Sequence, residues 1–249
     1  MTRRTRLLLL AMTSFSSGIA ASDTVVLLHG LGLAPWSLRR MEKGLVRAGY
    51  HVVNLGYDSR RVPLETLIAE WLPGQLETHG VALGADAPAR VHFVTHSMGG
   101  LIVRGWLARR EAPPPALHRV VMLAPPNHGT PLVDRIGSWR LFHLSMGING
   151  PRLGTGLDDF PASLPDVWPT GPELGIIAGN RPINPLLAAL TGGPGDGKVT
   201  VASTRLNGMA DHRVLPHSHT WIEFRTPVIR EVLSFLRTGR FSPRPPSQP

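Results

Sequence analysis

Cysteine is absent from the 249 residues of this chain. Its absence excludes disulfide bonds, a thiolate nucleophile and every zinc site that needs sulfur ligands. Lysine is almost absent as well, since Lys43 and Lys198 are the only two. Any covalent nucleophile must therefore be a residue of another type.

Acidic residues are also scarce. The chain has 17 Asp and Glu against 26 Lys and Arg, which gives a formal net charge of +9. Such an excess often indicates a nucleic-acid or anionic membrane partner. The basic residues here are nearly all arginines scattered along the chain, so we expect no nucleic-acid partner. A protein that binds through its charge stays an alternative, which the salt dependence of binding would test.

The apolar run near the N-terminus is too short to span a membrane, because a spanning helix needs about 20 apolar residues. Three arginines precede this run (7–12), and a stretch of small residues (14–22) follows it. This order is typical of a secretory signal peptide. We predict that residues 1–22 are a signal peptide and that the protein is exported, either periplasmic or secreted. It is cytoplasmic if this segment is not a signal.

The rest of the chain alternates short apolar or β-branched runs with stretches of helical periodicity. Hydrophobic residues make up 42% of the chain and charged residues 17%, which suits one domain with one sizeable core. The alternation predicts an α/β fold with a mostly parallel sheet and helices on both faces. The predicted strands are 24–28, 50–55, 90–95, 119–123, 174–178 and 212–215. The predicted helices are 36–48, 64–77, 98–110, 185–190 and 220–236.

The segment 130–172 breaks this alternation, because it holds several prolines and glycines with isolated apolar residues. It is longer than an ordinary loop. Two interpretations stay open: an irregular excursion that covers the edge of the sheet, or a lid or cap over a pocket. We expect residues 23–241 to form the domain and residues 242–249 to be a disordered tail.

The strongest local signal is the hexapeptide THSMGG at 95–100, between a predicted strand and a predicted helix. A strand, a tight turn of small residues and a helix form the context of a nucleophile elbow, which exposes a serine hydroxyl on a strained turn. The candidate nucleophile is Ser97. Thr95 stands where the G-x-S-x-G pattern has its first glycine. The alternative is that Ser97 caps the helix that follows it.

A second glycine-containing loop, HGLG at 29–32, follows the first predicted strand. Its position is that of the loop that supplies an oxyanion-hole N–H group in hydrolases with a nucleophile elbow. The backbone amides of Leu31 and Met98 are then the candidate donors. A dinucleotide phosphate loop is the rival interpretation, and Pro35 stands where that loop would need its third glycine.

A serine hydroxyl needs a base, and the base needs an orienting acid. Asp196 lies in a polar loop after strand 174–178, and His219 follows strand 212–215 at the start of the predicted closing helix. The order Ser97, Asp196, His219 is the one expected of a hydrolase with a nucleophile elbow.

Alternatives to these two residues stay open. His217 is the chief competitor for the base, and Asp211 is the competing acid. Asp196 could instead shape a turn and His219 could cap the last helix. His212, His217 and His219 could bind a metal, but no acidic ligand cluster accompanies them. We therefore expect neither a metal nor a cofactor.

With these motifs the chain resembles the α/β-hydrolase superfamily, and more narrowly the bacterial lipase- and esterase-like hydrolases. The segments that carry the resemblance are 29–32, 95–100, 124–130, 196–199 and 219–221. The resemblance implies an α/β-hydrolase fold, with Ser97 as nucleophile, Asp196 as orienting acid and His219 as base. It implies that the amides of Leu31 and Met98 form the oxyanion hole.

The activity implied by the resemblance is hydrolysis of carboxylic esters, chiefly lipid or acyl esters, through an acyl-enzyme intermediate. The same groups serve thioesterases and phospholipases, so both stay alternatives, as does a non-catalytic binding protein with this fold. The expected partner is a small-molecule ester or lipid substrate. A transient contact with a membrane or lipid interface is compatible with this activity, and we predict no protein partner.

Overall fold

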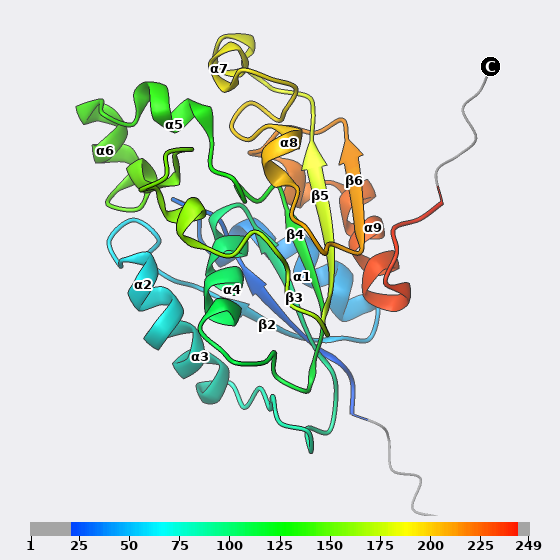
Figure 1. Ribbon diagram of the computed structural model, residues 1–249. Helices are drawn as coiled ribbons and strands as arrows, with labels where there is room; N and C mark the ends of the chain where they lie inside the picture. The colour runs from blue at the N-terminus through cyan, green and yellow to red at the C-terminus, as the bar shows by residue number, and fades with distance from the viewer. Residues whose placement is uncertain (1–20, 244–249) are drawn as a thin grey trace, which may run out of the picture.

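The computed structural model describes residues 21–243 of the chain (Figure 1). The predicted signal peptide at 1–22 and the predicted tail at 242–249 lie almost entirely outside the described residues. At the C-terminal end, the N–H of Ser242 donates to Oε2 of Glu231 at 2.8 Å. Tertiary contacts therefore continue past residue 241.

One six-stranded sheet forms the centre of the molecule, and each neighbouring pair of strands is parallel. Its spatial order is β2-β1-β3-β4-β5-β6. The strands are β1 (Thr24–Leu28), β2 (His51–Leu55), β3 (Val91–His96), β4 (Leu117–Leu123), β5 (Glu173–Gly179) and β6 (Asp211–Leu215). Each lies within two residues of its predicted bounds, and the predicted α/β class is confirmed.

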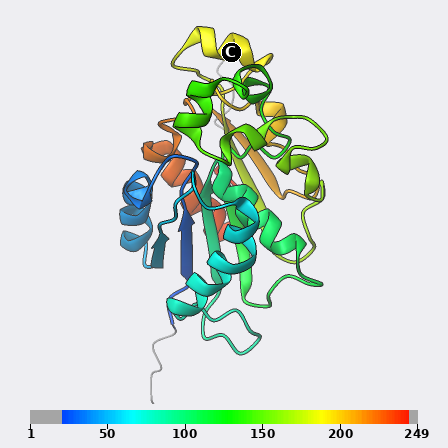
Figure 2. The ribbon, with the colours of Figure 1, turned by 90° about the vertical axis from the view of Figure 1, so that its left-hand side faces the viewer.

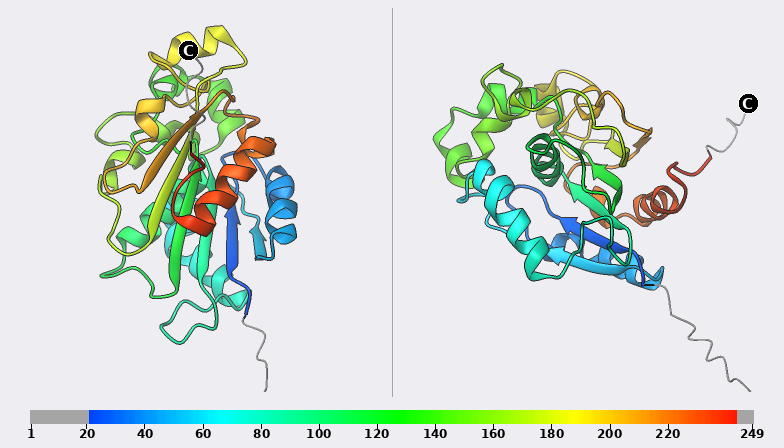
Figure 3. Two further views of the ribbon diagram at one scale, coloured as in Figure 1. Left: turned by 90° about the vertical axis from the view of Figure 1, so that its right-hand side faces the viewer. Right: turned by 60° about the horizontal axis from the view of Figure 1, so that its bottom comes forward.

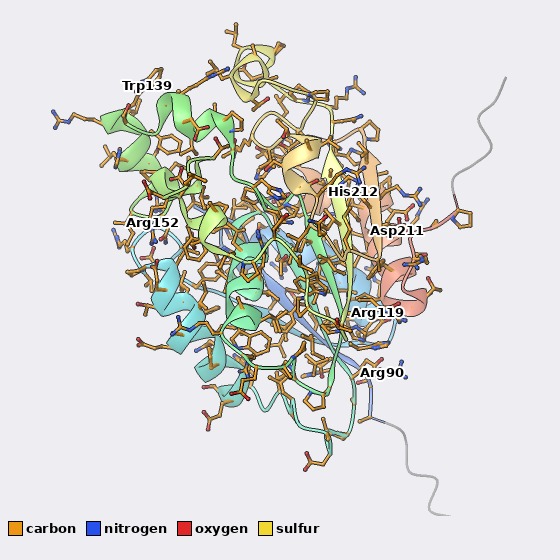
Figure 4. The ribbon with its side chains drawn as sticks, viewed as in Figure 1. Arg90, Arg119, Trp139, Arg152, Asp211 and His212 are labelled. Atoms are coloured by element: carbon orange, nitrogen blue, oxygen red, sulfur yellow. The ribbon has the colours of Figure 1, made fainter. Side chains whose placement is uncertain are left out.

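The strand sequences explain why the sheet is covered on both faces. Residues 25–28 of β1 are apolar and fully buried. A strand that is apolar at consecutive positions must have helices on each side, because its side chains alternate between the two faces. Arg119 on β4 adds a cross-strand ion pair with Glu173 on β5 at 2.6 Å (Figure 4).

Helices pack on both faces of the sheet (Figures 2 and 3). One face carries α1 (Arg39–Arg47) and α9 (Thr226–Thr238), whereas the other carries α2 (Leu64–Thr66), the π-helical turn η2 (Leu67–Trp71), α3 (Leu72–Thr78) and α4 (Met98–Ala108). Their apolar stripes bury Leu45 and Phe235 in one core, and Leu72 and Trp106 in the other. Both cores end at the carboxyl edge of the sheet, where ligand chemistry gathers in open α/β folds.

The closing helix corrects the prediction for 220–236. It begins at Thr226, because Pro227 would lose a hydrogen bond and clash with the carbonyl of Glu223 inside a longer helix. In the first turn of α9 the missing N–H of Pro227 costs nothing. The chain before it forms a turn and the short 3₁₀ helix η5 (Ile222–Phe224).

Two other predicted helices are also not continuous α-helices. The segment 64–77 is divided by the π-helical turn η2, which ends two residues before Pro73. A π turn absorbs an extra residue where a proline disturbs the i→i−4 ladder. The segment 36–48 opens with the 3₁₀ helix η1 (Pro35–Leu38), and α1 follows directly.

The segment 130–172 begins over the carboxyl edge of the sheet and then runs back past α4 to the start of β5 (Figure 1). It contains α5 (Pro131–Ile136), α6 (Arg140–Met146), and the 3₁₀ helices η3 (Gly150–Leu153) and η4 (Phe160–Ser163). Buried Asn149 attaches it to the loop before α2, because its Nδ2 donates to the carbonyls of Ser59 at 2.9 Å and Val62 at 2.7 Å. An ion pair between Arg152 and Glu65 adds a second link (Figure 4).

Two short helices complete the part of the chain that the structure describes. They are α7 (Pro185–Thr191), which packs beside α5, and α8 (Val201–Thr204). Within residues 21–243, no helix has the length and apolar character needed to cross a membrane.

A single buried cation fastens α4 to the end of segment 130–172. Arg104 is only 4% exposed, and its guanidinium donates to the carbonyls of Asn127 at 2.6 Å, Pro165 at 2.8 Å and Leu164 at 3.3 Å. Burial lowers the pKa of Arg104 to about 10, so the guanidinium stays charged at neutral pH. Three carbonyl groups depend on it for a hydrogen bond.

We expect Arg104→Met to lower the free energy of unfolding by about 3 kcal/mol, because buried acceptors lose a charged donor. Urea unfolding followed by circular dichroism measures the change. The matched control is Arg109→Met, at an exposed position at the end of the same helix, which should change the free energy by under about 0.5 kcal/mol. Equal losses in the two variants would contradict this role for Arg104.

Candidate functional site

The site is built around a strained turn at Ser97, between β3 and α4. Ser97 has φ 52° and ψ −121°, a conformation that non-glycine residues rarely adopt. Its N–H donates to the carbonyl of Leu123 on the neighbouring strand β4, at 2.8 Å. Ser97 is therefore held at the carboxyl end of β3 as the sequence predicts for an elbow, and its side chain makes no helix-capping hydrogen bond.

Close packing of α4 on β1 maintains this turn. A Cβ atom at Gly99 would stand 2.7 Å from the carbonyl oxygen of Leu28 and 2.9 Å from that of His29. Real Cβ atoms do not approach backbone oxygens so closely, so this position must be glycine. Thr95, which replaces the first glycine of the common pattern, is fully buried, and its Oγ1 would lie 3.3 Å from a Cβ at Gly100. A second small residue therefore makes room for the threonine.

Three predicted residues meet at this turn. Nε2 of His219 lies 3.0 Å from Oγ of Ser97, and Nδ1 of His219 lies 2.7 Å from Oδ2 of Asp196. The other carboxylate oxygen of Asp196 accepts from the N–H groups of Lys198 at 2.9 Å and Val199 at 2.8 Å. All three side chains are buried or nearly so. The chain thus places a hydroxyl, an imidazole and a carboxylate in one hydrogen-bonded row.

The competing residues do not reach this row. His217 borders a separate open cavity with Arg181 and Arg225, and burial together with the charge of Arg225 lowers its pKa. Asp211 lies on β6, where its carboxylate accepts from the N–H of Phe241 at 2.9 Å (Figure 4). The expectation that His219 adjoins the closing helix is wrong, because α9 begins seven residues later.

The histidines of the metal alternative, His212, His217 and His219, do not meet at one point. His212 on β6 (Figure 4) lies beside Oγ1 of Thr204 at 3.0 Å, away from the row at Ser97. Among residues 21–243, no three His, Asp or Glu side chains are grouped in a way that could hold a metal ion.

The amides of Leu31 and Met98 flank Ser97 and have no acceptor among the described residues. Contacts between His29 and Tyr57 fix the loop that carries Leu31. The ring of buried His29 stacks on Tyr57 with centroids 4.1 Å apart, and the Tyr57 hydroxyl donates to the carbonyl of His29 at 2.5 Å. Burial lowers the pKa of His29, so its ring is neutral. Two backbone donors without acceptors near a serine hydroxyl could serve as an oxyanion hole.

An apolar cavity of about 230 Å³ opens onto Ser97 and His219. One wall comes from the loop after β1, through Leu31 and Leu33, and the opposite wall comes from segment 130–172. That opposite wall includes Leu132, Val133, Ile136, Phe142, Met146 and Leu153. The segment therefore supplies eight of the seventeen residues that line the cavity.

The comparisons with known proteins agree with the fold. A model of the Alpha/beta hydrolase family matches residues 25–233. The chain belongs to the alpha/beta hydrolase family. No curated protein matches the sequence, so the remaining comparisons are with solved structures.

Those structures have the same fold at low sequence identity. The Bacillus licheniformis lipase BlEst2 in its mature form has a TM-score of 0.64 at 19% identity, with 89% of this chain and 93% of that chain covered. The metagenomic carboxyl esterase MGS0156 has a TM-score of 0.61 at 16% identity, with 81% of this chain and 66% of that chain covered. The Legionella pneumophila phospholipase PlaB has a TM-score of 0.58 at 21% identity, with 74% of this chain and 46% of that chain covered.

Two features of this family member escape prediction from the sequence. Lys198 borders the cavity, and loss of hydration lowers its pKa. Buried Glu223 lies near His96, directly before the elbow serine. A lysine beside Asp-Gly and a glutamate between Ile222 and Phe224 carry no pattern that indicates their positions. Thr130, whose hydroxyl donates to the carbonyl of Lys198, is different. It lies in the turn at 125–130, which resembles a turn found in many lipases, so its position near the site could be inferred from the sequence.

We expect Gly99→Ala to destabilise the fold, because its new methyl group would meet two backbone oxygens of the β1 loop. The expected loss is about 1–3 kcal/mol in the free energy of unfolding. The matched control is Gly74→Ala in α3, where a Cβ meets nothing within 4 Å, and a gain of about 0.5–1 kcal/mol is expected there. Thermal unfolding of both variants measures the contrast, and a neutral Gly99→Ala would contradict the tight packing of the elbow.

Proposed function

We propose that the protein is a serine hydrolase that cleaves carboxylic esters, with Ser97 as nucleophile, His219 as base and Asp196 as the orienting acid. The observation that carries the proposal is the row of two hydrogen bonds, 3.0 Å from Ser97 Oγ to His219 Nε2 and 2.7 Å from His219 Nδ1 to Asp196 Oδ2. Family membership supports the same class of reaction.

The chemistry follows from the acceptor and donor roles in this row. Asp196 accepts a hydrogen bond from Nδ1–H of His219, which keeps the proton on Nδ1 and leaves Nε2 able to take the proton of Ser97. The serine oxygen then attacks the ester carbonyl, and the amides of Leu31 and Met98 stabilise the oxyanion. Each such donor contributes about 3–4 kcal/mol in the transition state. His219 gives its proton to the leaving alcohol, and water repeats the cycle to release the acid.

The substrate class that we propose is an acyl or lipid ester. Its support is the apolar lining of the cavity, since six of its wall residues are aliphatic, aromatic or methionine side chains of segment 130–172. In this proposal α5 and α6 act as a cap over the acyl chain. Trp139 (Figure 4), Leu141 and Leu144 of the same segment are 59%, 75% and 81% exposed, which suits contact with a lipid interface.

Export belongs to the same proposal. Its support is the order of arginines, apolar residues and small residues within 1–22 of the sequence. An exported esterase would meet lipids and esters of the envelope or the surroundings.

We expect Ser97→Ala to abolish hydrolysis of a chromogenic ester, because no other group can form the acyl enzyme. The fold should persist, as judged by an unchanged circular dichroism spectrum. A fluorophosphonate probe should label the wild-type protein and leave Ser97→Ala unlabelled. His219→Ala should lower the rate by at least about 10³-fold, whereas the matched variant His217→Ala should keep it within about two-fold.

Retained hydrolysis in Ser97→Ala would overturn the proposed nucleophile. Absence of a fluorophosphonate adduct on the wild-type protein would favour a non-catalytic binding protein. A larger loss for His217→Ala than for His219→Ala would reverse the assignment of the base.

For the substrate, a series of p-nitrophenyl esters from acetyl to palmitoyl should show a rise in kcat/KM with acyl length. Each buried methylene adds about 0.8 kcal/mol of transfer free energy, until the cavity is filled. Phe142→Trp, which narrows the cavity, should move the preference toward shorter chains. A preference for acetyl esters in the wild-type protein, or greater rates with thioesters or phospholipids, would contradict the acyl-ester proposal.

A further inference from the structure

A second histidine and carboxylic acid lie behind the row at Ser97. Glu223 on η5 is 0% exposed and His96 at the end of β3 is 1% exposed. Oε1 of Glu223 is 3.8 Å from Nδ1 of His96. Within the described residues, neither carboxyl oxygen of Glu223 nor Nδ1 of His96 has a hydrogen-bond partner. Three buried polar atoms without partners in one place are unusual and call for an explanation.

Other parts of the protein pack closely against the His96 ring. A Cβ at Gly30 would stand 2.9 Å from Nδ1 of His96, so the loop after β1 closes one side. The rings of His96 and His219 lie with centroids 5.0 Å apart on another side. The 3.8 Å separation is itself too short for a bridging water and slightly too long for a direct hydrogen bond. A small rotation of either side chain closes that gap.

The other nitrogen of His96 fixes where its proton lies. Nε2 of His96 is 3.1 Å from the carbonyl oxygen of His219. A carbonyl oxygen can only accept, so Nε2 carries the proton, and Nδ1 of a neutral ring is then an acceptor. The group that faces Nδ1 must therefore be a donor. Glu223 is a donor only when its carboxyl is protonated.

Burial favours that protonated form. It raises the pKa of Glu223 to about 8 and holds the pKa of His96 well below its usual value. The backbone N–H of Glu223 itself and, to a smaller extent, the charge of Lys198 oppose this rise in the pKa only in part. His219, Lys198 and His29 are the charged or titratable groups that act on His96. The helices packed against η5, which are η1, α1 and α9, bring no charge that shifts the pKa of Glu223. At neutral pH the pair is thus uncharged.

We propose that Glu223 and His96 are positioning residues for the base of the reaction. The protonated Glu223 carboxyl donates to Nδ1 of His96, and the resulting Nε2–H of His96 donates to the backbone carbonyl of His219. Asp196 orients the ring of His219, whereas this second chain of hydrogen bonds fixes the backbone from which the ring extends. The inference rests on the proposed function, because it concerns the geometry of the same base.

A consequence for pH follows from the direction of the shift. The folded protein holds the Glu223 proton up to about pH 8, whereas the unfolded chain releases it near its ordinary value of about 4.3. The folded state binds more protons between these values, so stability falls as pH rises through this window. Above it, a carboxylate faces the Nδ1 acceptor, the chain of hydrogen bonds breaks, and we expect kcat to decline.

The decisive variant is Glu223→Gln, whose amide N–H₂ still donates to Nδ1 of His96 but does not titrate. We expect the decline in kcat near pH 8 to disappear, and the loss of stability between pH 5 and 8 to become smaller than in the wild-type protein. The matched control is Glu70→Gln, at an exposed position of η2. It should retain both the decline in kcat near pH 8 and the wild-type loss of stability between pH 5 and 8. Lys198→Met should move the decline to higher pH, because the charge of Lys198 lowers the pKa of Glu223.

A second pair of variants tests His96. The side-chain amide of His96→Gln can replace Nε2–H, whereas His96→Leu has no donor. We expect His96→Leu to lower kcat about ten-fold with KM unchanged, as for the loss of one hydrogen bond, and His96→Gln to recover most of that loss. The ¹⁵N shifts of His96 should identify the Nε2–H tautomer by NMR, with or without activity.

The inference is overturned if Glu223→Gln keeps the wild-type pH profile of kcat and of stability, or if His96 carries its proton on Nδ1. Equal losses in His96→Leu and His96→Gln would indicate a packing role alone. These results are distinct from failure of the proposed function, which shows as hydrolysis that survives Ser97→Ala or as absence of a fluorophosphonate adduct.

Discussion

The conformation of the Ser97 backbone is the constraint on which the site depends. A residue with a side chain stays at positive φ only when its surroundings hold it there. Here two contacts keep Ser97 in this conformation. Its N–H donates to the carbonyl of Leu123 on β4, and Gly99 packs closely against the carbonyls of Leu28 and His29. Three adjacent parallel strands thus determine one turn. The same contacts bring the loop with Leu31 close to the turn, so the proposed nucleophile and the proposed oxyanion donors depend on one set of contacts.

Buried polar groups, rather than surface charges, organise the edge of the sheet around that turn. Asp196 is satisfied by two backbone N–H groups, Arg104 by backbone carbonyls and Asn149 by the loop before α2. Asp196 thereby fixes its own loop, whereas Arg104 and Asn149 join segments that are far apart in the sequence. Apolar packing positions helices but specifies directions poorly, so these hydrogen bonds are what aligns the loops with one another.

Most of the sheet and the three residues of the row were predictable from the sequence, for physical reasons. A strand buried on both faces must be a run of apolar residues, and a tight elbow must have glycine where a Cβ would collide. The start of α9 was predicted wrongly, because the helical periodicity of 220–236 continues across Pro227 although the helix itself cannot. The positions of Glu223 and Arg104 were not predictable, since a buried ionisable group depends on neighbours that only the folded chain brings together.

The attachment of segment 130–172 has an evolutionary consequence. Hydrogen bonds fix it at three points. Thr130 donates to the carbonyl of Lys198, Asn149 donates to the carbonyl of Ser59, and the carbonyl of Pro165 accepts from Arg104. Between those points α6 has no fully buried residue, although its inner side lines the cavity. Mutations there can accumulate at little expense to folding, so this helix is where descendants of the protein would diverge in the molecules they accept.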